Sequence, residues 1–127
     1  MMAEVQPVSR RFDQSRIDAY AAASHDHNPL HVDPAFAAGT PFGGTVAHGM
    51  LVLALIGEMM HAAHGDAWLA RGRLKVRFKA PTRSGDTVTA SAELTNQSDV
   101  TVEYSVRCMN QAGEVLIEGR ASIGGAA

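Results

Sequence analysis

The segment between residues 48 and 63 constrains the fold most, because apolar side chains cover much of its helical circumference. A helix of this kind belongs inside a protein, so the rest of the chain must supply a surface that covers it. We expect this helix to begin at His48 and to end near Ala63. Its apolar residues are Met50, Leu51, Leu53, Ala54, Leu55, Ile56, Met59 and Met60.

The second half of the sequence changes to a two-residue period. Leu74, Val76 and Phe78 alternate with basic side chains, which predicts a strand with one apolar and one basic face. The same alternation predicts strands near residues 88 to 94, 102 to 108 and 115 to 123, and a short strand is expected near residues 5 to 11. Polar turns at residues 84 to 86, 96 to 98 and 110 to 113 have spacings that suit antiparallel hairpins. The predicted class is α+β, with a curved antiparallel sheet wrapped around the long central helix.

Two helices are expected before the central one, because capping residues mark their ends. The first has Asp13 as its cap and ends near Ser24. The second is about one turn long, with Asp33 as its cap, Pro34 at its first position and Gly39 just past its end.

Size and composition limit the classes of function. At 127 residues with 46% apolar side chains, residues 1–127 are expected to form a single domain with a real core. The formal charge of −2 gives nucleic acid and anionic membranes no electrostatic reason to bind. The longest apolar stretch, residues 50 to 56, is too short to cross a bilayer, and the lone Cys108 predicts a buried thiol. We expect a cytoplasmic protein.

The loop from Asp26 to His31 carries the candidate catalytic residues. Pro29 disfavours a helical conformation at Asn28, so the Asp26 and His31 side chains can converge. A carboxylate beside an imidazole can exchange protons with one water molecule, as general acid–base catalysis requires. Asn28 can fix the loop through Asx turns and is a candidate substrate-binding residue. The alternative is that Asp26 only caps a turn and His31 only satisfies a backbone carbonyl.

Gly49 is the candidate oxyanion-binding residue. It lies at the start of the apolar helix, where unpaired amides and a partial positive charge can stabilise an oxyanion. Because it has no Cβ, a carbonyl oxygen can approach its amide closely. The alternative is that Gly49 only allows tight packing where the helix enters the core.

These two elements together resemble a known motif. The run Ser24-His25-Asp26-His27-Asn28-Pro29-Leu30-His31-Val32-Asp33-Pro34 is followed, eighteen residues after His31, by Gly49 in Val46-Ala47-His48-Gly49-Met50. This pattern is similar to the hydratase 2 motif of the MaoC-like, (R)-specific enoyl-CoA hydratases. The resemblance covers nearly the whole chain, and it departs from the commoner pattern at His25, where a glycine is frequent.

The resemblance implies a hotdog fold and a hydro-lyase activity. Asp26 and His31 match the pair that activates water, and Gly49 matches the amide that polarises the thioester carbonyl. The implied reaction is reversible syn addition of water to a trans-2-enoyl thioester, or dehydration of a (3R)-3-hydroxyacyl thioester. No cofactor is expected, because coenzyme A or acyl carrier protein serves only as the carrier of the acyl substrate.

Three other functions stay open at this stage. His25, Asp26, His27 and His31 are potential metal ligands, although no metal site is expected, because neighbouring residues in an extended or turn segment point in different directions. A hotdog acyl-CoA thioesterase would need a carboxylate on the central helix, where Glu58 is the only acid. A non-catalytic acyl-thioester binding module would sequester the acyl chain without turning it over.

The predicted sheet also has consequences for assembly. A single hotdog chain leaves an exposed sheet edge and an open side to its pocket, so we expect a homodimer or a dimer-based oligomer. A basic stripe on the first strand of the second half is either a solvated sheet face or a contact surface for an anionic carrier. Its members are Arg71, Arg73, Lys75, Arg77 and Lys79.

Overall fold

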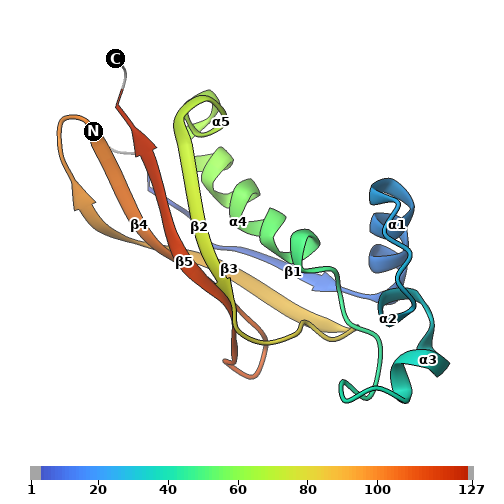
Figure 1. Cartoon of the computed structure of the whole chain (residues 1–127). Coiled ribbons are helices and arrows are strands. Elements are labelled where there is room, and N and C mark those ends of the chain that lie inside the picture. Colours follow the sequence, from blue (N-terminus) through green and yellow to red (C-terminus); the bar gives the residue numbers. More distant parts are fainter. Residues whose placement is uncertain (1–3, 126–127) are drawn as a thin grey trace.

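The computed structural model describes residues 4–125, and it contains one antiparallel sheet within that range. Figure 1 shows the sheet running diagonally across the molecule, with the helix α4 (Gly49–His64) lying along one of its faces. The spatial order of the strands is β1 (Val8–Phe12), β3 (Asp86–Gln97), β4 (Thr101–Met109), β5 (Val115–Gly124) and β2 (Gly72–Phe78). The predicted α+β class is confirmed, and every predicted strand is present.

The helix α4 (Gly49–His64) supplies one side of the core. Its buried residues pack against inward-facing residues of the sheet, among them Val88, Val106 and Leu116. The helix packs into the core as expected, but the sheet does not cover all of its apolar residues, because Met50 on its first turn is 60% exposed. A single sheet covers only one side of a helix, so the opposite side of α4 stays open. The buried residues of α4 are Val52, Leu55, Ile56, Met59 and Met60.

The capped helices form where the sequence predicts them. Helix α1 (Gln14–Ser24) is capped by Asp13, and α3 (Pro34–Ala38) is capped by Asp33. Each cap accepts a hydrogen bond from a backbone amide of the first turn, at 2.9 Å for Asp13 and 3.1 Å for Asp33. Two further helices, α2 (Pro29–Val32) and α5 (Asp66–Arg71), are not expected from the sequence, because they are too short to show a helical period.

Strand pairing differs from the predicted hairpins at one turn. Strand β2 pairs with β5, and not with β3, so the turn at Gly85 leads out of a bridge between Val46 and Arg83 into β3. Polar turn residues specify that the chain reverses, and they do not specify which strands pair. The turn expected at residues 96 to 98 begins later, because Asn96 and Gln97 extend β3 beyond a register shift. The hairpin between β4 and β5 has Gly113 at a φ of 80°, as its turn requires.

Two expectations about individual side chains, the exposed basic residues of β2 and the buried thiol of Cys108, are confirmed. Arg73, Lys75 and Arg77 are exposed on β2, as the basic face predicts. Cys108 is fully buried, and this burial raises the pKa of its thiol to about 12, so it stays a protonated core side chain. Among the described residues, no helix has the length and apolarity that crossing a bilayer would need.

The short helices gather where α4 begins. Figure 1 shows α1, α2 and α3 together beyond the end of the sheet, next to the first turn of α4. The segment from Thr45 to His48 is hydrogen-bonded on both sides: the Val46 amide donates to the Leu30 carbonyl at 3.2 Å, and the Ala47 amide donates to the Thr82 carbonyl at 2.8 Å. This arrangement brings the loop after α1 to the N-terminus of α4.

Candidate active site

The loop after α1 is shaped by local hydrogen bonds between residues two positions apart. His25 ends the helix in the left-handed region, with φ 63° and ψ 20°, and this turns the chain toward Asp26. A carboxylate oxygen of Asp26 accepts from the Asn28 amide at 3.3 Å, and Asn28 Oδ1 accepts from the Leu30 amide at 3.0 Å. These Asx-type bonds fix the loop, and they place Asn28 as the cap of α2. A direct contact between Asn28 and substrate stays a prediction.

His31 lies on α2 and is held from two sides. Its Nδ1 lies 2.7 Å from the backbone oxygen of Val46, and its own backbone carbonyl accepts from the Gln14 side chain at 2.7 Å. A carbonyl oxygen can only accept, so Nδ1 carries the proton of the neutral ring and Nε2 carries the lone pair. The nitrogen that is free to take a proton from water is therefore Nε2.

The structure brings Asp26 and His31 together and adds His48 to them. Polar atoms of the three side chains all lie within 4.8 Å of one another. Asp26 is exposed, His31 is half-buried and His48 is buried. The expected convergence of Asp26 and His31 is therefore observed, and the alternative in which each only serves its local backbone does not account for their approach.

His48 is the site residue that the sequence analysis missed. Its ring stacks on His31 with centroids 3.8 Å apart and planes 24° apart, and the Tyr20 ring contacts it edge-on at 4.8 Å. Its Nε2 lies 2.9 Å from the backbone oxygen of Asp26. The signal available in the sequence was a histidine at the cap position immediately before Gly49, on the helix already singled out.

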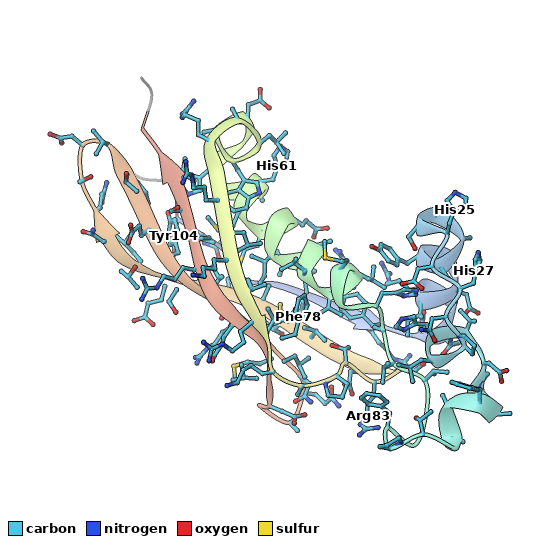
Figure 2. The ribbon with its side chains drawn as sticks, in the orientation of Figure 1. His25, His27, His61, Phe78, Arg83 and Tyr104 are labelled. Carbon is cyan, nitrogen blue, oxygen red and sulfur yellow. The ribbon has the colours of Figure 1, made fainter. Side chains whose placement is uncertain are left out.

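Gly49 begins α4, and its amide is among the first-turn donors that have no acceptor within a helix. A Cβ at this position would lie 3.1 Å from Cε1 of Phe78, so the ring closes tightly over the glycine. The two readings of Gly49, close packing and an accessible amide, are thus compatible. Figure 2 shows Phe78 between the sheet and the start of α4.

A cavity of about 370 Å³ opens beside Gly49. Its walls are mainly apolar and come from the Gly49 turn, the end of β2 and the loop that follows it. Asp26 and His31 do not line it, so the cavity adjoins the amide half of the site and not the carboxylate–imidazole half. The lining residues are Phe42, Ala47, Gly49, Val52, Phe78, Lys79, Ala80, Pro81, Thr82 and Ile117.

The structure brings together a different set of potential metal ligands from the set considered in the sequence analysis. The described cluster contains Asp26, His31 and His48, and it includes neither His25 nor His27. Figure 2 shows both of those residues beside α1, toward the outside of the molecule. In nearly parallel stacked rings the nitrogen lone pairs lie in separate planes, which does not suit the convergent tetrahedral geometry of zinc.

Comparison with known proteins assigns the family. A family model described as "MaoC like domain" matches residues 3–115. The (R)-specific enoyl-CoA hydratase of Aeromonas caviae is 35% identical over 121 residues, which span 91% of this chain and 88% of that protein. The 3-hydroxyacyl-thioester dehydratase Z of Mycobacterium tuberculosis is 37% identical over 91 residues, which span 68% of this chain and 60% of that protein.

A solved structure titled as the (R)-hydratase from A. caviae involved in PHA biosynthesis superimposes with a TM-score of 0.82 and 30% identity, covering 99% of this chain and 97% of that chain. The protein thus belongs to the MaoC-like family, and its sheet wrapped on α4 is a hotdog fold. The resemblance noted in the sequence is confirmed.

Proposed function

We propose that this protein is an (R)-specific enoyl-thioester hydratase, which in reverse is a 3-hydroxyacyl-thioester dehydratase. The observation that carries the proposal is the approach of Asp26 and His31 to each other beside the first turn of α4. The similarity to the Aeromonas caviae enzyme over 91% of this chain supports the same reaction class.

The geometry suits addition of water to a conjugated double bond. A water molecule held by Asp26 and His31 gives up a proton to the pair as its oxygen bonds to C3 of the enoyl group. The negative charge that develops on the thioester oxygen is stabilised by the Gly49 amide. The pair then delivers a proton to C2, so both groups return to their starting state. Dehydration runs through the same steps in reverse.

The acyl chain has a matching place to bind. The cavity beside Gly49 is mainly apolar, as a site for a hydrocarbon chain must be. A thioester carbonyl on the Gly49 amide would sit at the boundary between this cavity and the Asp26–His31 pair. We propose that coenzyme A or an acyl carrier protein acts only as the carrier, and that the reaction needs no metal.

A thioesterase reading is disfavoured by the state of Glu58. Its two carboxylate oxygens accept from Arg10 at 2.8 and 2.9 Å. Hydrogen bonding to this guanidinium keeps the pKa of Glu58 below its ordinary value, so the carboxylate is engaged in an ion pair. It also lies nine residues beyond Gly49, or about 13 Å along the helix.

Crotonyl-CoA separates the three candidate activities in one assay. A hydratase consumes the enoyl absorbance, a thioesterase releases free thiol, and a binding module does neither. We expect loss of the enoyl absorbance without thiol release, with a (3R)-3-hydroxybutyryl product on chiral analysis. Thiol release at a comparable rate, or an inert protein across a series of enoyl-CoA chain lengths, contradicts the proposal. Stoichiometric zinc or iron in the purified protein contradicts the metal-free assignment.

We further propose that the protein acts as a homodimer or a dimer-based oligomer. Strand β2 is an edge of the described sheet, and large apolar side chains are exposed on β2, α4 and α5. An unpaired edge beside apolar surface favours association with a second copy. Sedimentation velocity should give at least twice the 13.4 kDa chain mass. A fully active monomer contradicts this assembly. The exposed apolar residues of these three elements include Phe78 on β2, Met50 on α4 and Leu69 on α5.

A further inference from the structure

His48 is in contact with both halves of the proposed site. Its peptide bond leads directly into Gly49, whose amide faces the thioester oxygen in the proposed reaction. Its ring lies flat against His31, and its Nε2 is hydrogen-bonded to the backbone oxygen of Asp26 at 2.9 Å. A single residue therefore connects the two halves: its buried side chain contacts the water-handling pair, and its backbone leads into the carbonyl-polarising amide.

The hydrogen bonds of the two stacked rings define their tautomers. The partner of His48 Nε2 is a carbonyl oxygen, as is the partner of His31 Nδ1, so both of these nitrogens donate. In the neutral rings, the lone pairs are consequently on Nε2 of His31 and on Nδ1 of His48. Each ring is fixed by one donated hydrogen bond and by the face of the other ring.

The Nδ1 atom of His48 makes no hydrogen bond that would stabilise the fold. His48 is only 3% exposed, and its Nδ1 has no hydrogen-bond partner among the described residues. A buried polar atom without a partner lowers stability, and an aromatic hydrocarbon of similar size would fill the same space without that cost. Stability alone therefore does not explain a histidine at this position.

We propose that His48 is a positioning residue of the hydration reaction, which fixes the Asp26–His31 pair relative to the Gly49 amide. The inference rests on the proposed function, because it assigns a role within that reaction. His48 acts through Asp26 and His31 and contributes no proton of its own. It holds the backbone of Asp26 by hydrogen bonding, and it limits the tilt of the His31 ring by stacking.

The role predicts a loss in kcat with little change in KM. Because a shift of about 1 Å in a reacting group can cost about 100-fold in rate, we expect kcat to fall by about 10- to 100-fold without His48. Since His48 does not line the acyl cavity, binding of the acyl chain should be preserved.

The test uses two substitutions at His48 and one control on the same helix. His48→Phe keeps a ring for stacking and removes the donor to Asp26, whereas His48→Gln keeps an amide donor near the Nε2 position. His61→Gln makes the same change at an exposed histidine of α4. Each variant is measured for kcat and KM with crotonyl-CoA and for its thermal midpoint.

We expect His48→Phe to keep or raise the thermal midpoint while kcat falls and KM stays within about twofold, as an enzyme that trades stability for function would show. His48→Gln should recover part of the lost kcat, and His61→Gln should match the wild type. A kcat within twofold of wild type in both His48 variants overturns the proposal. So does a parallel loss of thermal midpoint and kcat with a raised KM, which marks a purely structural role.

Imidazole nitrogen NMR of the unliganded protein tests the same proposal without any activity. We expect the proton on Nδ1 of His31 and on Nε2 of His48 in the neutral rings, and a changed His31 signal in a His48 variant. An unchanged His31 signal, or a proton on Nδ1 of neutral His48, overturns the positioning role. If the wild type is inert on every enoyl-CoA while the NMR result is as expected, the proposed function fails and the His48–His31 coupling stands.

Discussion

The two ends of α4 both carry histidines. His48 lies immediately before the first turn and stacks on His31, whereas His61 and His64 lie in the last turn. Figure 2 shows His61 and Tyr104 toward one end of the molecule, with His25 and His27 beside α1 at the other. Both ends combine histidine with an aromatic neighbour, which is Tyr20 beside His48 and Tyr104 beside His64. They differ in what the surrounding backbone offers to the imidazole rings.

The first end offers two backbone carbonyls that fix the ring tautomers, a nearby carboxylate and the free amides of a helix N-terminus. At the last end, His64 Nε2 bonds the Tyr104 hydroxyl at 2.9 Å, and burial lowers the pKa of His64 and raises that of Tyr104. Histidine content alone therefore does not define a catalytic site. The site is defined by the acceptors that orient each imidazole ring and by the partial charge of the helix end.

The largest effect should follow from removing the pair at the first end. We expect the Asp26→Asn, His31→Ala double variant to lose about two to four orders of magnitude in kcat/KM on crotonyl-CoA, because general acid–base catalysis is lost. The matching His61→Gln, His64→Gln variant should keep its rate. Full hydratase activity in the Asp26/His31 variant would remove the functional difference between the two ends.

A smaller loss of kcat/KM should follow from blocking the access of substrate to the Gly49 amide. Gly49→Val adds a branched side chain where even a Cβ lies 3.1 Å from Phe78, so kcat/KM should fall by about 100-fold. Gly57→Ala is the control on the same helix, because a Cβ there meets nothing within 4 Å. It should stabilise the protein by about 0.5–1 kcal/mol and leave the rate unchanged. Equal kinetics for the two variants would argue that the Gly49 amide has no role.

Backbone strain at the first end gives a stability prediction. His25 is the only non-glycine residue with positive φ in residues 4–125, at 63°. Because an L side chain in this conformation costs roughly 1–2 kcal/mol, His25→Gly should raise the free energy of unfolding by about 1 kcal/mol. His27→Gly, at an exposed neighbour without positive φ, should lower it. Urea denaturation of both variants measures the difference, and a destabilised His25→Gly protein would contradict the strain.

The smallest effect concerns pH at the last end. Burial lowers the folded pKa of His64 below its ordinary 6.5, so the unfolded chain binds its proton more readily. The contribution of neutral His64 to the free energy of unfolding is complete above about pH 6.5, and it is lost as the pH falls through the lowered pKa of the folded state. We expect His64→Gln to flatten the decline in urea midpoint between about pH 7 and 5. Identical slopes for wild type and His64→Gln would show that His64 is not buried as neutral imidazole.

Much of this architecture was predictable because it depends on local physics. Asp13 and Asp33 cap helices through amides three residues away, and the alternation in β2 reports partial burial of one face. The convergence of Asp26 and His31 follows from local geometry, because only five positions separate them and Asn28 and Pro29 fix the turn into α2 between them. Strand order was not predictable in this way, since the turn at Gly85 is compatible with several pairings.

The sequence by itself determined the α+β class, the central helix to within one residue at each end, and the approach of Asp26 to His31. It also determined the family, through a motif that spans both halves of the site. Tertiary structure alone decided that β2 pairs with β5, that one side of α4 stays open, and that Phe78 closes over Gly49. It also stacked His48 on His31, seventeen residues apart, because the packing of α1 and α2 against the start of α4 brings these segments together. Periodicity and capping describe how a segment relates to its own neighbours, whereas contacts between distant segments exist only once the core has formed.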